Sequence, residues 1–484
     1  MKVFLGNPPW QADGFYGVRA GSRWPHLRPY KEGAAKYIPF PFFLAYAAAL
    51  LEKNNFNVCI ADAIADEMDE EDFLTSIKDF SPDLVVLETS TPSIYTDIKT
   101  SRKIKEETGA LIALCGPHVT VNAENILNEN LFIDYILLGE YEFTLLKLAT
   151  HLKENRDTGT IPAIASRVNN EGIKTNRKLP FIPDINDLPW PARHRLPMGK
   201  YNDTFANIPS PSLQILSSRG CPYKCIFCLW PSVMYRNNIF RGRDPINVID
   251  EIEWCISKYS FKSFFFDDDT FNIEKNRVIK ICDEIKGRNL KIPWAVMARP
   301  DIMDKDILKT LADSGLYAIK YGIESGDTRI LERSGKSLDL KRSKDIVKIT
   351  RDLGIKVHLT FAIGLPGENH ETLKRTFDFA LSLHPDDMQF SLVVPFPGTE
   401  YFDYLERERL LITKDWSKYN GLSSSVFKTE HLTGEELEAA LLVANKIRQR
   451  YMLKRDLLSF DWKYYKKGLL HPLKVLKKIF TLLS

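Results

Sequence analysis

The chain has 484 residues, of which 44% are hydrophobic and 27% are charged, and its formal net charge is +3. This length exceeds one ordinary hydrophobic core, so we expect two or three domains. The near-neutral charge does not indicate nucleic acid binding. No apolar run approaches the roughly 20 residues of a membrane-spanning helix, and the N-terminal peptide has the pattern of a strand rather than a secretory signal. Seven cysteines are too few for a disulfide scaffold of this length, which predicts a reducing, cytoplasmic environment.

Short apolar runs alternate with helix-like segments over residues 1–177, which predicts an α/β domain with a parallel sheet. The expected strands are Lys2–Leu5, Val58–Ala61, Leu84–Glu88, Leu111–Cys115 and Tyr135–Leu138. Helical patterns, such as Phe42–Asn54 and Asp97–Thr108, separate them. Ligands bind beyond the carboxyl ends of such strands. The loops expected there are Asn7–Trp10, Thr89–Pro92, Gly116–His118 and Gly139–Glu142.

A proline-rich segment, residues 178–210, is predicted to be mostly linker. Residues 211–400 then show a second alternating series. Its expected strands are Leu213–Ser217, Ser263–Phe266, Trp294–Ala298, Ala318–Tyr321, Lys356–Phe361 and Asp387–Val393. Helical patterns lie between them, for example at Pro245–Lys258 and Asn276–Lys286. Six such units predict a complete or partial TIM-like (β/α) barrel, whose chemistry lies on the loops after the strands. Residues 401–484 have a helical pattern.

Three cysteines, Cys221, Cys225 and Cys228, directly follow the first expected barrel strand. Their thiolates are the usual ligands of iron–sulfur clusters, and three ligands leave one iron open for another molecule. The alternative is a structural zinc ion, which normally needs four nitrogen or sulfur ligands. No fourth ligand is obvious nearby. The other four cysteines lie in apolar segments and are expected to be core residues.

The C-x3-C-x2-C spacing at the start of a βα barrel resembles that of the radical S-adenosylmethionine (AdoMet) superfamily, and Phe227 fits the aromatic position before the third cysteine. The resemblance implies that the three cysteines hold a [4Fe–4S] cluster whose open iron binds AdoMet. One electron then cleaves the sulfonium, and a 5′-deoxyadenosyl radical takes hydrogen from the substrate. An external electron donor, such as ferredoxin or flavodoxin, is implied.

Three later loops are also similar to loops of that superfamily. Asp268 and Asp269, after the second barrel strand, resemble residues near the AdoMet amino group. The Gly322–Gly326 and Gly364–Glu368 segments resemble loops near its ribose or carboxylate and its adenine. The residues that the resemblance and the pattern predict for AdoMet are Phe227, Asp268, Asp269, Arg299, Glu324, Ser325, Gly364 and Pro366.

An α/β domain before such a barrel resembles the cobalamin-binding (B12-binding) branch of the superfamily. This resemblance implies cobalamin contacts at Pro8, Pro9, Trp10, Ser90, Thr91, Gly116, Pro117, His118, Gly139, Glu140 and Tyr141. The chain departs from one pattern. Cobalamin domains that bind cobalt through histidine carry an Asp-x-His-x-x-Gly motif, whereas Asp62–Asp66 contains no histidine. We therefore expect no histidine ligand there. A domain of this shape that has lost cobalamin is the alternative.

Several short peptides resemble a narrower group, the hopanoid radical AdoMet enzymes that make cyclitol ethers. They are Gly21–Pro25, Thr89–Pro92, Cys228–Pro231 and Asp267–Ile273. The resemblance implies ring contraction of a polyol headgroup on an isoprenoid-type lipid. Arg23, Trp24 and Trp230 are the predicted substrate residues, and Arg19 and His26 lie in the same loop, which has no helix or strand pattern. The substrate is thus expected to be lipid-linked or another small molecule.

The C-terminal segment, Trp462–Ser484, carries six lysines among leucines and aromatic residues. Such a basic amphipathic segment suits peripheral contact with an anionic membrane, here the inner face of the cytoplasmic membrane, and equally suits a helix packed on the barrel.

Two functional alternatives remain open at this point. The first is a cobalamin-dependent radical AdoMet methyltransferase that acts on carbon. The second is a non-catalytic iron–sulfur or cobalamin sensor. Methylthiolation is not favoured, because it normally needs three further cysteines in the N-terminal domain, where only Cys59 and Cys115 occur.

Overall fold

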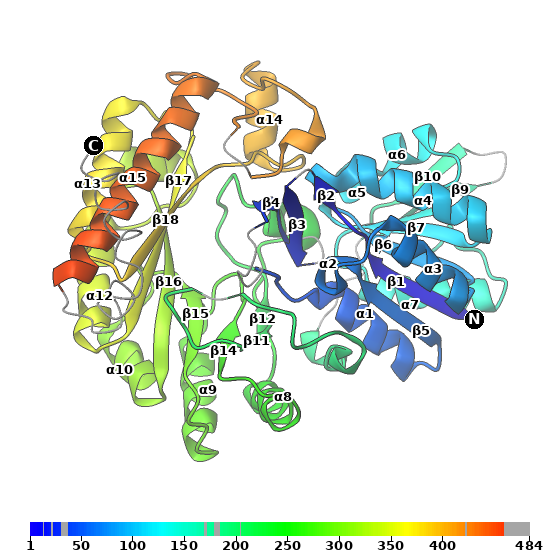
Figure 1. Cartoon of the computed structure of the whole chain (residues 1–484), viewed down its shortest axis with the longest axis horizontal. Helices are drawn as coiled ribbons and strands as arrows, with labels where there is room; N and C mark the ends of the chain where they lie inside the picture. Colours follow the sequence, from blue (N-terminus) through cyan, green and yellow to red (C-terminus); the bar gives the residue numbers. More distant parts are fainter. Residues whose placement is uncertain are drawn as a thin grey trace.

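The computed structural model describes residues 1–12, 14–20, 23–30, 37–168, 172–178, 184–203, 205–421 and 424–458. Two α/β units lie side by side, and a small antiparallel sheet lies between them (Figure 1). Most of their buried residues belong to one continuous hydrophobic cluster that extends from α1 (Phe42–Lys53) into the barrel. The two units therefore share a core.

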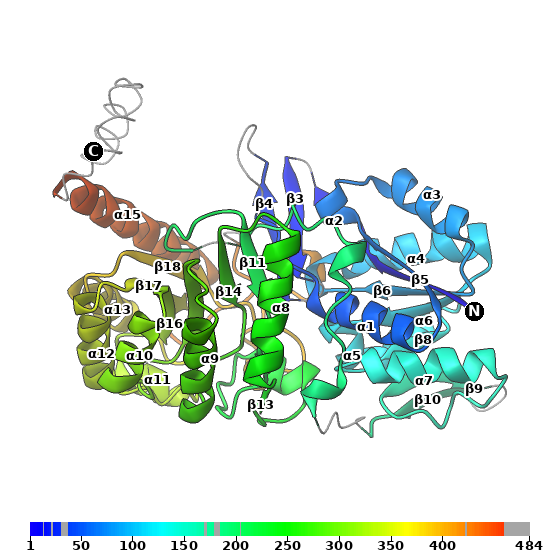
Figure 2. The same cartoon turned by 90° about the horizontal axis from the view of Figure 1, so that it is seen from below.

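The N-terminal unit is built on a seven-stranded sheet with the order β10-β9-β8-β7-β6-β1-β5. Its parallel strands are β1 (Lys2–Asn7), β5 (Asn57–Asp62), β6 (Leu84–Glu88), β7 (Leu111–Cys115) and β8 (Tyr135–Leu137). Every residue of β6 is buried, because helices cover both faces of the sheet. One face carries α1 and α7 (Glu142–Lys153), and the other carries α3 (Glu70–Phe80), α4 (Ile94–Thr108) and α6 (Ala123–Glu129) (Figure 2). The predicted parallel sheet is confirmed.

Two strands of this sheet were not predicted. β9 (Ile164–Val168) and β10 (Gly172–Asn176) extend it in the antiparallel direction beyond β8. No residue of β10 is buried, so its sequence has none of the apolar signal of the inner strands.

The second unit contains six parallel strands in the order β11-β14-β15-β16-β17-β18, which form a curved, partial barrel (Figure 1). The strands are β11 (Ser212–Ile215), β14 (Ser263–Phe266), β15 (Trp294–Ala298), β16 (Leu316–Glu324), β17 (Lys356–Ile363) and β18 (Asp387–Leu392). The helices between them are α8 (Pro245–Lys258), α9 (Lys275–Gly287), α10 (Lys305–Asp313), α11 (Thr328–Arg333), α12 (Leu340–Asp352) and α13 (His370–Ser382). All six predicted barrel strands are confirmed: β14 and β15 have the predicted bounds, and the ends of the other four differ by at most three residues.

The small sheet corrects one prediction. The segment around Arg19 and His26 was expected to be an irregular loop, but it forms β2 (Gln11–Ala12), β3 (Phe15–Ala20) and β4 (Arg23–Pro29). These antiparallel strands pair only with one another, so their stability depends on contacts with the two larger units.

The described part of residues 178–210 contains two short 3₁₀ turns and no strand, as expected for a linker. It is nevertheless packed: Arg193 and Glu251 of α8 form a buried ion pair at 2.8 Å. After the barrel come α14 (Glu400–Arg407), the turn η5 (Trp416–Lys418) and α15 (Gly434–Leu458). The basic segment Trp462–Ser484 lies outside the described residues. Among the helices that are described, none is both long enough and apolar enough to cross a membrane.

Candidate functional site

The cysteine loop, residues 220–229, lies between β12 (Ser218–Arg219) and the π-helix η4 (Trp230–Met234). Backbone hydrogen bonds fix its path: the Ile226 N–H donates to the Ser334 carbonyl, and the Tyr401 N–H donates to the Ile226 carbonyl, both at 3.0 Å. The loop begins at Gly220, whose φ of +87° suits glycine and few other residues.

The three predicted ligands, Cys221, Cys225 and Cys228, are free thiols and are partly exposed. Burial raises the pKa of Cys228, and the neighbouring Cys225, Asp269 and Cys221 raise it further. The backbone brings two of these residues together, because the Cys228 N–H donates to the Cys225 carbonyl at 3.0 Å. Within the described ranges, no three His, Cys, Asp or Glu side chains are arranged to hold a single metal ion. Three cysteine thiols in one loop are the donor type that iron–sulfur clusters use.

Two cations lie beside this donor set. Burial raises the pKa of the Cys225 thiol, whereas Lys336 and Arg299 lower it. The buried Arg299 side chain stacks on the Tyr223 ring of the cysteine loop, 3.6 Å from the ring centroid, and forms an ion pair with Asp301 at 2.8 Å. Positive charge next to the loop stabilises thiolates and an anionic cluster. Arg299 therefore lies beside the cysteine loop, and its contact with AdoMet stays a prediction.

Glu324, at the end of β16, accepts a hydrogen bond from Lys336 at 3.1 Å. Burial alone would lower the pKa of Lys336, but Glu324 and Cys225 outweigh burial, and the pKa rises. Sequence analysis missed Lys336, because it follows α11 in a segment with no recognisable pattern. The tertiary fold alone brings its ammonium group to the barrel mouth.

The carboxylates of Asp268 and Asp269 accept hydrogen bonds from different parts of the chain. Both oxygens of the buried Asp268 carboxylate accept hydrogen bonds from the backbone and hydroxyl groups of Ser217 and Ser218, at 2.5–3.1 Å. Asp269 accepts a hydrogen bond from the Gly220 N–H at 2.9 Å. Asp268 thus supports the strand that leads into the cysteine loop, so its predicted contact with AdoMet is not favoured. Asp269 lies at the loop itself and keeps its predicted role.

The remaining residues predicted for AdoMet lie on three barrel loops. Ser325 is fully buried and contacts the Thr376 hydroxyl at 3.1 Å, which argues against contact with a ligand. Gly364 has a φ of +93° and donates its N–H to Glu368 at 2.6 Å. Pro366 follows it in the same buried turn, and Phe227 is partly exposed in the cysteine loop. Gly364, Pro366 and Phe227 stay predictions.

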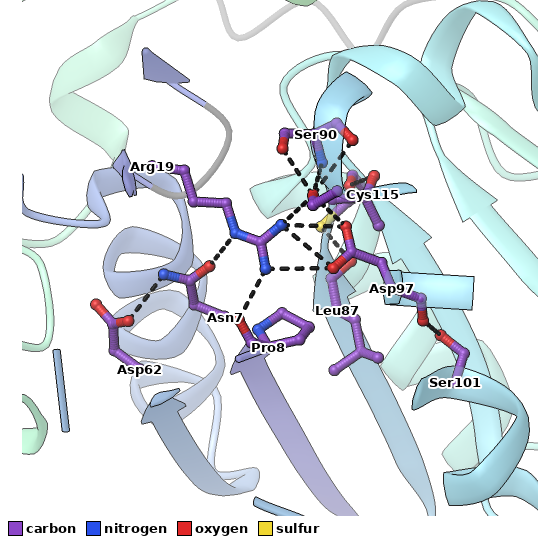
Figure 3. Close-up of polar contacts among 11 residues, drawn as sticks. Asn7, Pro8, Arg19, Asp62, Leu87, Ser90, Asp97, Ser101 and Cys115 are labelled. Carbon is purple, nitrogen blue, oxygen red and sulfur yellow. Dashed lines mark hydrogen bonds and ion pairs between the residues drawn. The ribbon is translucent and has the colours of Figure 1, made fainter. Parts of the chain in front are cut away.

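The carboxyl edge of the N-terminal sheet faces the barrel (Figure 1). Here β3 is fixed to the sheet by Arg19, a residue that is 1% exposed. Its guanidinium donates to Asn7 Oδ1 at 2.7 Å and to the Pro8 carbonyl at 2.8 Å, and it forms an ion pair with Asp97 of α4 at 3.1 Å (Figure 3). Arg19 therefore has a structural role at this edge, rather than lining an open route.

The predicted loops at this edge come together as expected. Trp10 accepts the Gly17 N–H at 2.7 Å through its carbonyl group and is buried beside β3. Ser90 and Ser93 form a capping box at the turn η1 (Thr91–Ser93), and Pro117 begins α5 (Pro117–Val121) after Gly116, which has a φ of +117°. Buried Pro9 completes the first loop. These short turns lie at one edge of the sheet, and their contacts with cobalamin stay predictions.

The last predicted cobalamin loop has a different role from the one expected. Both Glu140 oxygens are engaged, by Arg219 at 2.9 Å and by Arg241 of β13 (Arg241–Gly242) at 2.7 Å. Tyr141 is fully buried and donates to Glu88 of β6 at 2.7 Å. Glu140 and Tyr141 thus contact protein groups, which argues against direct cobalamin contacts. Gly139, with a φ of +65°, stays a predicted contact.

No histidine follows β5, as the sequence indicated. Asp62 instead accepts hydrogen bonds from Asn7 at 2.8 Å and from Tyr201 at 3.0 Å, and burial raises its pKa to about 6. His118 lies on the other side of the edge, where it is buried against Thr91 at 3.3 Å and the Trp416 ring at 5.2 Å. The donor set therefore fits cobalamin without a histidine ligand after β5.

Among the predicted substrate residues, only Trp230 has a described side chain. It is 5% exposed and stacks on Phe43 of α1, with ring centroids 5.4 Å apart. Trp230 thus packs between the two units, which argues against contact with substrate. The side chains of Arg23 and Trp24 lie outside the described residues, although their backbone belongs to β4. Three of the four cysteines expected in the core, Cys115, Cys255 and Cys282, are buried, and Cys59 is partly exposed.

His118 gives a pH-dependence prediction. Burial lowers its pKa from 6.5 to about 4, so the unfolded chain binds a proton between these values while the folded chain does not. His118 therefore does not reduce the free energy of unfolding above pH 6.5, and it reduces this free energy increasingly as the pH drops toward 4. Between pH 7 and pH 5 the free energy of unfolding should fall by about 2 kcal/mol through this residue. Because Asp62 also titrates in this range, the quantity to compare is the difference between proteins: denaturant titration at both pH values should show a loss in the wild type that exceeds the change in His118→Gln by about 2 kcal/mol. An equal loss in the variant contradicts the prediction.

Comparison with known proteins identifies the class of enzyme to which this fold belongs. Residues 215–380 match the model of the radical SAM superfamily, and residues 33–149 match that of the B12 binding domain. The structure of TsrM, a radical AdoMet methyltransferase from Kitasatospora setae with cobalamin and a [4Fe–4S] cluster bound, is similar with a TM-score of 0.65 and 19% identity, over 84% of this chain and 75% of that one. The cobalamin-dependent enzyme OxsB, in its apo form, is similar with a TM-score of 0.71 and 17% identity, over 99% of this chain and 71% of that one. The fold is thus that of a radical AdoMet enzyme with a cobalamin-binding domain.

Proteins with similar sequences support the same assignment. The uncharacterized methyltransferase PH0819 of Pyrococcus horikoshii is 32% identical over 404 residues, which cover 83% of this chain and 86% of that protein. The anaerobic magnesium-protoporphyrin IX monomethyl ester cyclase of Cereibacter sphaeroides is 29% identical over 87% of this chain and 68% of that protein. The chain belongs to the cobalamin-binding branch of the radical AdoMet superfamily. It is an enzyme whose cofactors are a [4Fe–4S] cluster, AdoMet and cobalamin.

Proposed function

We propose that this enzyme transfers a methyl group from AdoMet to a carbon atom of a small-molecule substrate. One observation carries the proposal: Arg219, two residues before Cys221, forms ion pairs with Glu140 and Glu142 at the carboxyl edge of the N-terminal sheet, at 2.9 and 2.6 Å. The cluster loop and the cobalamin edge are therefore direct neighbours. A methyl carrier and a radical generator must both reach one substrate carbon, and this arrangement suits that requirement.

When bound, the cluster and AdoMet supply a radical that removes hydrogen, and cobalamin supplies a carrier for the methyl group. The chain contributes position and charge. Lys336 and Arg299 place positive charge beside the thiolates, and Asp269 holds the start of the cysteine loop through Gly220. The relative PH0819 is named as a methyltransferase, and so is the cytidylyl-2-hydroxyethylphosphonate enzyme of Streptomyces wedmorensis, which is 27% identical over 75% of this chain and 77% of that protein. These names favour methyl transfer.

The structure accounts for two of the peptides that suggested lipid chemistry. The Trp230 side chain after the third cysteine packs on Phe43, and the Ser90 turn caps η1. Both therefore have packing roles that need no lipid substrate. The predicted lipid-linked polyol thus has less support than methyl transfer, and peripheral membrane contact depends on a segment outside the described residues.

Isotope labelling tests the proposal. The reconstituted enzyme, a low-potential reductant and AdoMet labelled in its methyl group are incubated with a small-molecule extract of the source cells. Methyl transfer to carbon should put the label into a new product and release both S-adenosylhomocysteine and 5′-deoxyadenosine. Rearrangement of a polyol would release 5′-deoxyadenosine without S-adenosylhomocysteine or labelled product. A sensor would release neither nucleoside. The second or third result contradicts methyl transfer.

A further inference from the structure

The segment Gly139–Glu142 of the N-terminal unit contacts the elements on both sides of the cysteine loop. In β12, just before the loop, the Arg219 guanidinium donates to Glu140 and Glu142. In η4, which follows the loop, the carbonyl of the last residue, Met234, accepts from the Glu140 N–H at 3.2 Å. The fit there is close, because a Cβ atom on Gly139 would lie 2.7 Å from the same Met234 carbonyl oxygen. One four-residue segment thus holds the loop that carries all three cluster ligands.

Arg219 is the centre of this contact. Its side chain has no exposed surface, and its guanidinium lies over the Phe43 ring at 4.3 Å and over the Tyr46 ring at 5.1 Å, both on α1. Glu140 also binds Arg241 of β13, the strand that pairs with β12. The guanidinium therefore connects the strand before Cys221 to two elements of the N-terminal unit. A planar group with fixed donor directions holds such neighbours in one geometry.

Stability is a poor explanation for this arrangement. Removing an arginine and two carboxylates from water costs as much as, or more than, their attraction returns. In addition, two buried atoms of the pair, Arg219 Nε and Glu142 Oε2, have no hydrogen-bond partner among the described residues. A hydrophobic contact of the same size would hold the two units together equally well. The ion pairs differ from such a contact in that they specify a geometry.

We propose that Arg219 is a positioning residue that couples cobalamin binding to AdoMet binding. Gly139 lies at the cobalamin edge, and the same segment, through Glu140 and Glu142, holds the cysteine loop. Hence cobalamin that orders the Gly139–Glu142 segment should also order the cysteine loop, and AdoMet that orders the cysteine loop should also order the segment. Coupling of this kind is typically about 5-fold or more in affinity, and it is reciprocal. This coupling concerns only the binding of cobalamin and AdoMet, so it is independent of whether the enzyme transfers a methyl group or rearranges its substrate.

The test measures cobalamin affinity in the full-length, cluster-reconstituted protein. The cluster is kept oxidised, so that AdoMet binds without cleavage, and hydroxocobalamin is titrated by absorbance with and without AdoMet. In the wild type, AdoMet should tighten cobalamin binding about 5-fold or more, and cobalamin should tighten AdoMet binding by the same factor. Arg219→Lys and Glu142→Gln should each lose most of this difference, because neither can keep both charged contacts of the planar guanidinium.

The matched control is Arg193→Lys. Arg193 is equally buried and forms an ion pair with Glu251 at 2.8 Å, but it does not contact the Gly139–Glu142 segment. Thermal unfolding shows whether each variant is folded, and the Glu142→Gln variant keeps the test valid if Arg219→Lys fails to fold. Coupling retained in the Arg193→Lys control and lost in the other two variants supports the proposal. The proposal is wrong if the wild type shows no coupling, if folded Arg219→Lys or Glu142→Gln retains it, or if Arg193→Lys loses it equally.

Discussion

Replacing Cys221, Cys225 or Cys228 with alanine should reduce release of 5′-deoxyadenosine from AdoMet by at least about 1000-fold. The physical reason is that three thiolates must hold the cluster while its fourth iron stays open for AdoMet, and the loop offers three thiols and no substitute. A cluster held by these three cysteines would supply the electron for AdoMet cleavage, so loss of one ligand should remove nearly all of the reaction. The measurement is 5′-deoxyadenosine after anaerobic reconstitution, together with the iron content of each protein.

Cys59→Ala is the control for this experiment. Cys59 lies on β5, is partly exposed, and is a free thiol like the three ligands. Its removal should leave the iron content and nucleoside release unchanged. If a variant of any loop cysteine released 5′-deoxyadenosine at the wild-type rate, the assignment of the cluster ligands would be wrong.

Gly220→Ala should cause the second largest loss in release of 5′-deoxyadenosine. The residue has a φ of +87°, which costs an alanine roughly 1–2 kcal/mol, and its new Cβ would lie 2.1 Å from the Ile239 carbonyl oxygen. Backbone atoms on both sides must then move, and Cys221 is the next residue. A shift of about 1 Å in such a site costs on the order of 100-fold in rate. We therefore expect nucleoside release to fall about 100-fold, with a lower iron content.

Gly109→Ala is the control, because it has the backbone strain of a positive φ without a close contact that would displace neighbouring atoms. Gly109 ends α4 with a φ of +68°, so alanine meets a similar conformational cost, but nothing lies within 4 Å of the added Cβ. This variant should lose some thermal stability and keep its full iron content and activity per folded molecule. If Gly220→Ala behaves like Gly109→Ala, the close approach to Ile239 does not position the cluster loop.

The contacts at the cobalamin edge explain why sequence and structure differ for particular residues. The resemblance to cobalamin-binding enzymes implied a cobalamin contact for Glu140, and this residue does follow strand β8. Its carboxylate nevertheless binds Arg219 and Arg241, which are 79 and 101 residues away in the chain. A local pattern shows where a strand ends, but not which distant cation lies opposite. The same reason applies to Trp230, whose partner Phe43 lies in another unit.

The sequence by itself determined the features that depend on local spacing. Buried parallel strands are continuous apolar runs, so the inner strands of both sheets were predictable, and three closely spaced cysteines define a cluster loop within a few residues. Only the tertiary structure decided which polar groups meet. It pairs Arg219 with Glu140 and Glu142 across the two units, and within the barrel unit it brings Lys336 to the cysteine loop. Such pairs join residues that are far apart along the chain. Their formation depends on how the units, and the loops within the barrel, pack, and no local pattern encodes that packing.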